Sequence, residues 1–416
     1  MNYLDIHPTE RLRVSLTLPA SKSISNRALL INALSHSEDA PQNVSDCDDT
    51  RVMVAALRNM PDVIDIGAAG TAMRFLTAYL SVTPGVHTIT GTERMRHRPI
   101  GILVDALRRL GASVDYKGEA GFPPLRIVGN PQLRGGELEL AGDVSSQYIS
   151  ALLMIAPTLS EGLRLRLTGN IVSRPYLDMT VAMMREFCAR VEWEGEDMLR
   201  VDPVPYQPRT YTIENDWSAA SYWYEMVALS LDAQAEVILP GLHLDSLQGD
   251  WRVSEIFAEL GVATECFRLP DGTEAVRLSK REVKTDRLSL DMTRQPDLAQ
   301  TMAVTAAMLD IPFTLSGLRT LRIKETDRIA ALCNELQHLG LDIEDKGGDS
   351  IEWTGIRDRA TRHPVISTYE DHRMAMAFAP LALKAPVCIN HPEVVRKSYP
   401  HFWSDMRCAG FRVESK

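Results

Sequence analysis

Apolar residues recur at helical spacing in stretches that each follow a polar or charged segment. After Ile100, the positions Leu103, Val104, Leu107 and Leu110 have the spacing of a helix with one buried face. Polar residues in front of such a stretch are typical of a helix N-terminus. Including this one, the predicted helices begin near Ser21, Asp46, Gly70, Arg98, Ser145, Ser173, Asp216, Asp250, Asp297, Lys324 and Asp371.

The predicted helix starts form two interleaved series. Starts that carry small or capping residues, from Gly70 to Asp371, lie about 70–80 residues apart, and charged starts, from Arg98 to Lys324, keep nearly the same spacing. Strand-like segments and a hairpin turn at Asp271-Gly272 lie between them. This period predicts a duplicated unit of two helices and several strands, in about six copies, with the first copy truncated.

Length and charge narrow the class of protein. The 416 residues are too many for one core and suit two domains. The formal net charge of −10 disfavours general binding to nucleic acid or to anionic membranes. No apolar run approaches the roughly 18 residues of a membrane span, and the first residues lack the pattern of a signal peptide. We therefore expect a cytoplasmic protein without nucleic-acid or membrane partners.

The six cysteines are scattered and predict no metal site. No C-x-x-C and no Cys/His spacing of a zinc site occurs, so we expect neither a metal nor another cofactor. Cys188 and Cys333 fall within apolar helical patterns and are expected in the core. This usage is typical of a reducing compartment.

The densest charged segment is Arg322–Arg328, which holds five charges in seven residues directly before an amphipathic pattern. Lys324 and Arg328 are one helical turn apart, and Glu325 shares a face with Arg328. The segment fits an anion site at a helix N-terminus, with Glu325 as a proton-transfer group. It equally fits a solvated helix start with weak local ion pairs.

Other helix starts have the same character. A predicted strand over 11–19 leads into Ser21–Arg27, whose hydroxyls and cations suit a phosphate or carboxylate, or only an N-cap. The small residues 67–70 allow close approach of a ligand, or only tight packing. The loop 91–100 carries three arginines within five residues, which is a stronger anion signal.

Taken together and in order, these segments resemble the 3-phosphoshikimate 1-carboxyvinyltransferase family, the EPSP synthases. The resemblance implies an α/β (α+β) protein with the two-domain, inverse α/β barrel-like enolpyruvyl transferase fold of about six βαβαββ repeats. One domain would comprise 1–20 plus 216–416, and the other 21–215. The segments that carry the resemblance are 21–27, 69–74, 98–100, 145–147, 173–176, 296–297, 324–328, 371–376 and Lys397.

The implied reaction transfers the enolpyruvyl group of phosphoenolpyruvate to the 5-hydroxyl of shikimate 3-phosphate by addition and elimination, with release of phosphate. This step lies on the shikimate pathway to chorismate and the aromatic amino acids. It needs no metal or other cofactor. The resemblance therefore implies small-molecule partners in one cleft onto which the polar helix starts converge, and we expect a monomer.

The resemblance also assigns roles to residues. Asp297 matches the base on the 5-hydroxyl, although by itself it reads as a helix N-cap. Glu325 matches the group that moves protons at C3, and Lys22 and His372 match further catalytic groups. The implied phosphoenolpyruvate contacts are Lys22, Gly70, Arg98, Gln147, Arg328, Arg373 and Lys397. The implied shikimate 3-phosphate contacts are Lys22, Ser23, Arg27, Ser145, Ser146, Gln147, Ser173, Tyr176, Asp297 and Lys324.

Three positions depart from the family pattern. Ala68 and Thr320 each stand where an Asn is usual, and Phe75 stands where Pro is usual. We expect these departures to affect affinity and inhibitor response more than reaction type. A glyphosate-like mimic of phosphoenolpyruvate is still expected to compete, because Gly70 keeps space open.

Two alternatives remain at this point. The first is the sister enolpyruvyl transferase that acts on UDP-N-acetylglucosamine, which usually carries a catalytic Cys in the loop before its Arg-Pro; the loop 92–98 has none. The second is a non-catalytic phospho-ligand-binding protein of the same fold. The intact set of Lys22, Asp297 and Glu325 argues against it.

Overall fold

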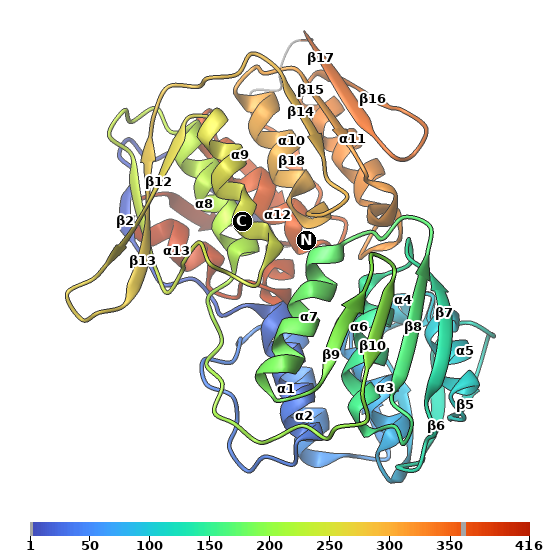
Figure 1. Cartoon of the computed structure of the whole chain (residues 1–416). Helices are drawn as coiled ribbons and strands as arrows, with labels where there is room; N and C mark the ends of the chain where they lie inside the picture. Colours follow the sequence, from blue (N-terminus) through green and yellow to red (C-terminus); the bar gives the residue numbers. More distant parts are fainter. Residues whose placement is uncertain (1–2, 359–362) are drawn as a thin grey trace. The chain divides into compact units, whose positions relative to one another are not determined.

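The computed structural model describes residues 3–358 and 363–416, and its backbone divides into two compact units. Unit 1 comprises Met1–Pro19 and Asn215–Lys416, and unit 2 comprises Ala20–Glu214. Each unit is built from four-stranded sheets with helices between the strands (Figure 1).

One topology recurs in all five sheets formed by the described residues. In each sheet two parallel strands are followed by two antiparallel pairings. In three sheets the four strands are consecutive in the chain: a helix joins the parallel strands, and a second helix leads to a hairpin whose last strand pairs with the second strand. In the other two sheets one strand comes from the N-terminal segment. In unit 2 this gives the strand orders β3-β4-β6-β5 and β7-β8-β10-β9. The strands are β3 (Val63–Asp65), β4 (Gly85–Thr90), β5 (Ser113–Tyr116), β6 (Leu125–Gly129), β7 (Gly136–Ala141), β8 (Leu163–Thr168), β9 (Val191–Glu194) and β10 (Met198–Val201).

The first repeat of unit 2 has helices but no sheet of its own among the described residues. Between its two helices a single bridge joins Gln42 to Thr212. The predicted truncation of the first copy is therefore confirmed. The helices of unit 2 are α1 (Lys22–Leu34), α2 (Asp48–Asn59), α3 (Gly70–Val82), α4 (Glu93–Arg96), α5 (Gly101–Arg109), α6 (Ser146–Ile155), η1 (Ala156–Thr158) and α7 (Arg174–Glu186).

Unit 1 has three complete sheets, and the N-terminal segment completes two of them. The orders are β2-β11-β13-β12, β14-β15-β17-β16 and β18-β19-β1-β20. The strands are β1 (Tyr3–His7), β2 (Arg13–Ser15), β11 (Glu236–Pro240), β12 (Val262–Arg268), β13 (Glu274–Lys280), β14 (Leu288–Asp291), β15 (Phe313–Ser316), β16 (Leu341–Asp345), β17 (Ile351–Arg357), β18 (Val365–Ile366), β19 (Val387–Asn390) and β20 (Arg412–Ser415).

Helices of unit 1 begin close to Asp216, Asp250, Asp297 and Asp371, as predicted, although two of them open with a short 3-10 turn. The helix predicted near Lys324 begins at Arg328, and the helix Phe402–Cys408 was not predicted. Asp271-Gly272 is the turn of the β12–β13 hairpin, as predicted. The helices are α8 (Trp217–Leu229), η2 (Gly249–Arg252), α9 (Val253–Glu259), η3 (Pro296–Leu298), α10 (Ala299–Met308), η4 (Arg319–Ile323), α11 (Arg328–His338), α12 (His372–Phe378), η5 (Ala379–Leu383), η6 (Pro392–Lys397) and α13 (Phe402–Cys408).

Two expectations about local structure are wrong. The predicted strand over 11–19 is reduced to the three residues of β2, which pair parallel with β11. Cys188 is exposed, because it follows the end of α7 in left-handed backbone (φ 65°) and turns away from the apolar face; Cys333 is buried as expected. Among the described residues, no helix is long and apolar enough to cross a membrane.

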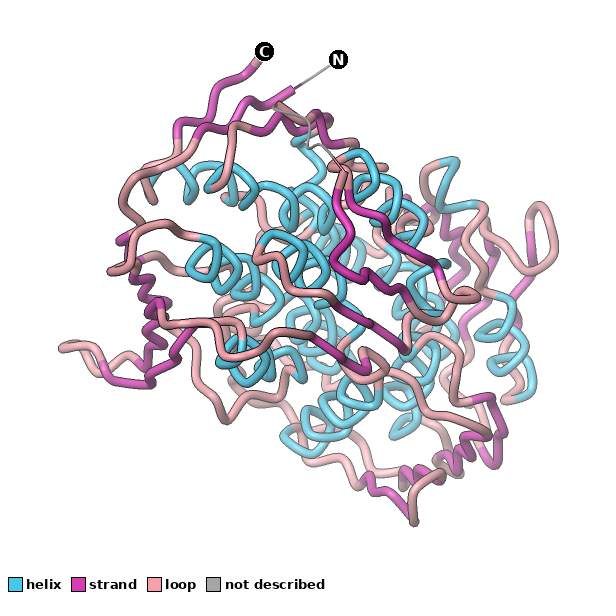
Figure 2. Tube along the Cα trace, turned by 90° about the horizontal axis from the view of Figure 1, so that it is seen from above, coloured by secondary structure: helices cyan, strands magenta, loops and turns pink. Residues whose placement is uncertain are grey.

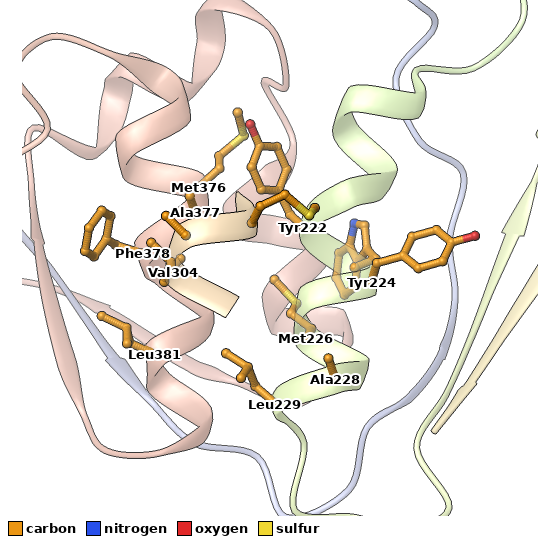
Figure 3. Close-up of a cluster of buried hydrophobic side chains, with 14 of the residues drawn as sticks. Tyr222, Tyr224, Met226, Ala228, Leu229, Val304, Met376, Ala377, Phe378 and Leu381 are labelled. Atoms are coloured by element: carbon orange, nitrogen blue, oxygen red, sulfur yellow. The ribbon is translucent and has the colours of Figure 1, made fainter. Parts of the chain in front are cut away.

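The core of each unit lies between its helices, with the sheets toward the outside (Figure 2). In unit 1, Tyr222 and Met226 of α8 lie near Val304 of α10 and Phe378 of α12 (Figure 3). α8 is buried on nearly every side, which suits a helix surrounded by others. Strands bury alternate residues, so their polar side chains face solvent. Because the middles of these helices are mostly surrounded by apolar residues, charged side chains can cluster mainly at the helix ends.

Candidate active site

A buried arginine in unit 1 joins three carboxylates from separate elements. Arg328, at the first position of α11, has a side chain that is only 2% exposed. Its Nε donates to Asp371 Oδ2 at 2.6 Å, Nη1 donates to Asp297 Oδ1 at 3.0 Å, and Nη2 donates to Glu325 Oε2 at 2.7 Å. The network therefore fixes the starts of α10, α11 and α12 at one place.

Three further cations complete this network. Arg373 Nη2 donates to Asp297 Oδ2 at 2.9 Å, and Lys324 Nζ lies 4.0 Å from Asp297 Oδ1. Lys397 Nζ, at the end of η6, lies 3.1 Å from Glu325 Oε1. Glu325 is thus held between two cations, as expected, but its second partner is Lys397 rather than the neighbouring Lys324.

The charges in this network shift the affinities of its groups for protons. Burial would raise the pKa of Asp297, but the charges of Arg373, Lys324 and Arg328 outweigh burial and hold it well below its usual range. Burial lowers the pKa of Lys324, although Asp297 opposes the change. Burial also acts to lower the pKa of Arg328, but Asp371, Glu325 and Asp297 raise it overall. Asp297 is therefore an anion while these cations surround it.

A further carboxyl lies beside this network. Asp250 of η2 is buried and accepts a hydrogen bond from Ser218 Oγ near the start of α8. Burial, and next the negative charge of Asp297, raise the pKa of Asp250 to about 7, while Arg373 acts against the rise. Asp250 can therefore hold or release a proton near neutral pH. In the sequence it is visible only as a polar helix start.

His372 is almost fully buried, and its Nδ1 lies 3.6 Å from Asp371 Oδ1. Asp371 also caps α12, because its Oδ1 accepts a hydrogen bond from the backbone N–H of Arg373 at 2.8 Å. One buried carboxylate thus contacts the two predicted site residues of α12 and Arg328 of α11.

In unit 2, Arg27 of α1 ties that helix to α6 and α7. Its Nε donates to Thr180 Oγ1 at 2.7 Å, and its Nη2 donates to Ser150 Oγ at 3.1 Å and to the Tyr176 carbonyl at 3.4 Å. The guanidinium lies over the ring of Phe75, with 5.4 Å to the centroid. Burial lowers the pKa of Arg27 to about 10, although the Tyr176 side chain opposes the change. Most of its donors already have protein partners.

The starts of α3 and α6 and the arginine loop also meet within unit 2. Gln147 Nε2 donates to Thr71 Oγ1 at 3.1 Å. The guanidinium of Arg98 lies directly against Gly70: a Cβ built on that residue would be 2.5 Å from Arg98 Nη1. Only a glycine at this position lets Arg98 lie where it does. Backbone N–H groups at a helix start and an arginine beside them form a favourable place for an anion.

The remaining predicted residues of unit 2 lie at or near these helix starts. Lys22 begins α1, and its Nζ lies 3.7 Å from the buried Asp49 Oδ2. Ser145 caps α6, since its Oγ accepts a hydrogen bond from the N–H of Gln147 at 3.4 Å. Ser173 precedes α7 in left-handed backbone. The others are Ser23, Ser146 and Tyr176, in the first turns of α1, α6 and α7.

Each unit therefore gathers its own part of the predicted set. Unit 1 brings together Asp297, Lys324, Glu325, Arg328, His372, Arg373 and Lys397, and unit 2 brings together helix starts that carry the others. The N-cap interpretation of Asp297 is wrong, since Gln295 precedes η3, Leu298 precedes α10, and the Asp297 side chain meets two arginines. Sequence reasoning missed the contacts of Asp371, Asp49 and Asp250.

The two interpretations of the charged segment 322–328 apply to different residues. Arg322 is partly exposed and pairs with Asp327 at 3.0 Å and with Asp345, which is the local ion-pair arrangement. Glu325 and Arg328 instead belong to the buried network. Among the described residues, no group of three or more His, Cys, Asp or Glu side chains is arranged to hold a metal ion.

Comparison with known proteins gives consistent results. The model of the EPSP synthase (3-phosphoshikimate 1-carboxyvinyltransferase) family matches residues 6–62 and 58–406. A protein of Bacteroides fragilis named 3-phosphoshikimate 1-carboxyvinyltransferase is 56% identical over 415 residues, covering 100% of this chain and 99% of that protein. One of Shewanella halifaxensis with the same name is 36% identical, covering 97% and 98%.

Solved structures show the same fold at low identity. EPSP synthase from Acinetobacter baumannii superposes with a TM-score of 0.79 at 23% identity, covering 100% of both chains. The enolpyruvyl transferase NikO from Streptomyces tendae gives a TM-score of 0.75 at 13% identity, covering 100% of this chain and 99% of that one. With the family model matching nearly the whole length and relatives 36–56% identical, this chain belongs to the EPSP synthase family.

Proposed function

We propose that the chain transfers the enolpyruvyl group of phosphoenolpyruvate to the 5-hydroxyl of shikimate 3-phosphate and releases phosphate. The observation that carries this proposal is the buried network around Arg328. It holds two candidate proton-transfer groups, Asp297 and Glu325, among cations that suit phosphate and carboxylate. Full-length identity with relatives that bear the enzyme's name supports it.

The proposed binding groups come from both units. Phosphoenolpyruvate is contacted by Lys22, Gly70, Arg98, Gln147, Arg328, Arg373 and Lys397. Shikimate 3-phosphate is contacted by Lys22, Ser23, Arg27, Ser145, Ser146, Gln147, Ser173, Tyr176, Asp297 and Lys324. The support for these assignments is that the helix starts of each unit place cations, hydroxyls and backbone N–H groups together.

In the addition step, C3 of phosphoenolpyruvate gains a proton and C2 becomes electrophilic. The 5-hydroxyl oxygen then bonds to C2 and gives up its proton. Glu325 is proposed to exchange protons at C3, since Arg328 and Lys397 hold its two oxygens at 2.7 and 3.1 Å. In the elimination step, phosphate leaves C2 and the new methyl group loses a proton, which restores the double bond. Lys22 and His372 complete the proposed catalytic set.

Asp297 is proposed as the base for the 5-hydroxyl, and its surroundings suggest how its strength is controlled. Without substrates, three cations hold its pKa low. Anionic substrates that pair with Arg373, Arg328 and Lys324 would compete with Asp297 for these cations. The pKa of Asp297 would then rise, so it would become an effective base only when both substrates are bound.

We also propose that the two units are the two domains of the enzyme, 1–20 plus 216–416 and 21–215. The enzyme is proposed to act as a monomer in the cytoplasm. The support is that the backbone divides into two compact units with nearly these bounds, and that all six cysteines are free, as is usual in a reducing compartment.

The direct test is phosphate release by the purified protein. We expect inorganic phosphate to appear with phosphoenolpyruvate plus shikimate 3-phosphate, and not with phosphoenolpyruvate plus UDP-N-acetylglucosamine. Phosphate release from phosphoenolpyruvate with UDP-N-acetylglucosamine, but not with shikimate 3-phosphate, would assign the chain to the sister activity. Binding of both substrates without release would support a non-catalytic phospho-ligand-binding protein.

The contact between Gly70 and Arg98 predicts a selective effect of one methyl group. In Gly70→Ala the new Cβ would displace the Arg98 guanidinium. The guanidinium is the end of a flexible side chain, so the fold should tolerate its displacement. A lost hydrogen bond to a charged group is worth about 1.5–3 kcal/mol, which corresponds to a rise of roughly 10–150-fold in the KM for phosphoenolpyruvate. We expect the KM for shikimate 3-phosphate to change little. A glyphosate-like inhibitor that competes with phosphoenolpyruvate should lose affinity in the same variant.

The matched control is Gly118→Ala, because that glycine is exposed and an added Cβ would meet only Pro124 Cδ at 3.9 Å. Steady-state kinetics with each substrate varied in turn measures both effects. An unchanged KM for phosphoenolpyruvate in Gly70→Ala would show that Arg98 does not bind this substrate in the position seen here.

A further inference from the structure

The loop between β18 and α12 contains two consecutive non-glycine residues in left-handed backbone. Tyr369 has φ 53° and Glu370 has φ 56°. Such backbone is unfavourable for residues with a Cβ, and it persists only where the surrounding structure holds it. Asp371, His372 and Arg373 follow directly. The segment that delivers these residues therefore depends on contacts from outside the loop.

α11 holds this loop at two points along one face. Arg328 and Glu335 are seven residues apart, which is nearly two helical turns, so they point to the same side. Arg328 Nε binds Asp371 Oδ2 at 2.6 Å. Two turns further on, Glu335 Oε1 accepts a hydrogen bond from Tyr369 Oη at 2.7 Å, and Glu335 Oε2 accepts one from the Ser367 backbone N–H at 3.2 Å.

Besides the loop, Glu335 contacts the largely exposed His338 of α11, whose Nδ1 lies 3.8 Å from Glu335 Oε1; this contact does not require a buried carboxylate. The Glu335 side chain is 1% exposed, in a helix whose other buried residues are mainly apolar. A buried carboxylate is unfavourable unless hydrogen bonds compensate for the water that it loses. An apolar residue would fill the same place without that cost, but it would not bind the loop. The carboxylate therefore serves to hold residues 367–369 through its two hydrogen bonds.

We propose that Glu335 and Tyr369 are positioning residues, whose hydrogen bond holds the left-handed loop so that Asp371 meets Arg328 and Arg373 meets Asp297. The connection is short: Asp371 Oδ1 caps α12 by accepting the N–H of Arg373, and Arg373 Nη2 reaches Asp297 at 2.9 Å. A shift of the loop would move both contacts together. The choice of assay rests on the proposed function, but the structural argument does not.

The test is Tyr369→Phe, which removes the hydroxyl and keeps the ring. We expect kcat/KM for phosphoenolpyruvate to fall about 10–100-fold, as for the loss of other groups that orient site residues. The KM for shikimate 3-phosphate should change less than about twofold, since most of its proposed contacts lie in unit 2. The matched control is Ser367→Ala. It keeps the backbone N–H that donates a hydrogen bond to Glu335 Oε2, so it should behave as wild type.

Hydrogen exchange provides a readout that does not depend on activity. In Tyr369→Phe, backbone amides in 367–373 should exchange faster than in wild type, while those of the other sheets of unit 1 stay unchanged. This measurement is informative even if the wild-type protein releases no phosphate, so failure of the proposed function and failure of this inference are distinguishable. Equal loss for both substrates with unchanged exchange in 367–373 would overturn the inference.

A second variant tests the role of backbone strain. Gly at position 370 adopts left-handed backbone without penalty. Adding Glu370→Gly to Tyr369→Phe should therefore recover at least about threefold in kcat/KM for phosphoenolpyruvate. No recovery would contradict the claim that the hydrogen bond offsets strain. If Tyr369→Phe does not fold, Glu335→Gln should show the same selective effect on phosphoenolpyruvate, and an unselective effect would overturn the inference.

Discussion

Replacing Glu325 by Gln should lower turnover by about 10²–10⁴-fold, the usual effect of removing a general acid–base group. Gln has nearly the same shape, but its single amide oxygen can accept from only one of Arg328 and Lys397, which lie 2.7 and 3.1 Å from separate carboxylate oxygens of Glu325. It cannot carry a proton between C3 and solvent. The loss should therefore appear in kcat. The KM for phosphoenolpyruvate should stay level or fall, because the variant removes a negative charge that competes for these cations.

Glu393→Gln is the matched control, since Glu393 lies in η6, the element that carries Lys397, but is about half exposed and pairs with His391 at 3.1 Å. Its kinetics should equal those of wild type. A further measurement isolates the proton step: exchange of deuterium from solvent into C3 of phosphoenolpyruvate should be lost together with turnover. Turnover within a few-fold of wild type in Glu325→Gln would assign proton transfer at C3 to another group.

Helix starts could be predicted from the sequence because their signals are local. A polar cap followed by apolar residues at helical spacing requires no knowledge of distant segments, and the starts predicted near Ser145, Asp216 and Asp371 are caps in the structure. The repeat period was readable for the same reason. The fold class followed from that period together with the resemblance.

Strand pairing at the N-terminus could not be predicted, because the partners are far away in sequence. β1 has only five residues, yet it lies between β19 and β20, with Leu4 opposite Ile389 and Ser415. β2 pairs only three residues, with β11. In each case the strand is stabilised by completing a sheet whose other members come from the same repeat. Nothing in residues 3–15 encodes that completion.

The candidate site shows the same division. Arg98 was recognisable as an anion-binding group from its local setting, and Arg373 from the resemblance to the family. The partner of each was not, because charge pairing depends on tertiary packing: Arg328 meets Asp371, 43 residues away, and Arg27 meets Thr180, 153 residues away. Motif reading therefore identified which segments matter, while the structure shows which side chains already have partners.

Replacing Arg328 by Met should cause the largest loss of stability of any single change considered. The side chain is 2% exposed, and its removal leaves Asp371, Asp297 and Glu325 close together with one cation fewer. Breaking a buried ion pair on one side costs about 3–5 kcal/mol. For a domain of this size we expect the unfolding midpoint of unit 1 to fall by roughly 6–20 °C. Turnover should be lost as well, because both proposed proton-transfer groups lose a shared partner.

The stability loss in Arg328→Met should depend on pH, and the direction of that dependence follows from the pKa of Asp297. In wild type the pKa of Asp297 is lowered, so its contribution to stability is present above its unfolded value and is lost as pH falls toward the folded value. Arg328 is one of the three cations that lower it, so in Arg328→Met the pKa of Asp297 rises and the contribution near neutral pH shrinks. At pH values below the pKa of Asp297 in both wild type and Arg328→Met, this difference in stability between the two proteins vanishes. The deficit should be largest at pH 7–8 and should shrink below about pH 5.

Arg322→Met separates this effect from the loss of any arginine in the segment. Arg322 also contacts two carboxylates, Asp327 and Asp345, but its side chain is 28% exposed, and solvent-accessible pairs contribute about 0–1 kcal/mol. Thermal unfolding of both variants and wild type at a series of pH values decides the matter. A deficit in Arg328→Met that is constant with pH, or that grows on acidification, would mean that lost packing, not uncompensated negative charge, causes the instability. In that case the cations of the network would not lower the pKa of Asp297. The proposal that bound anions control the base strength of Asp297 would then be wrong as well.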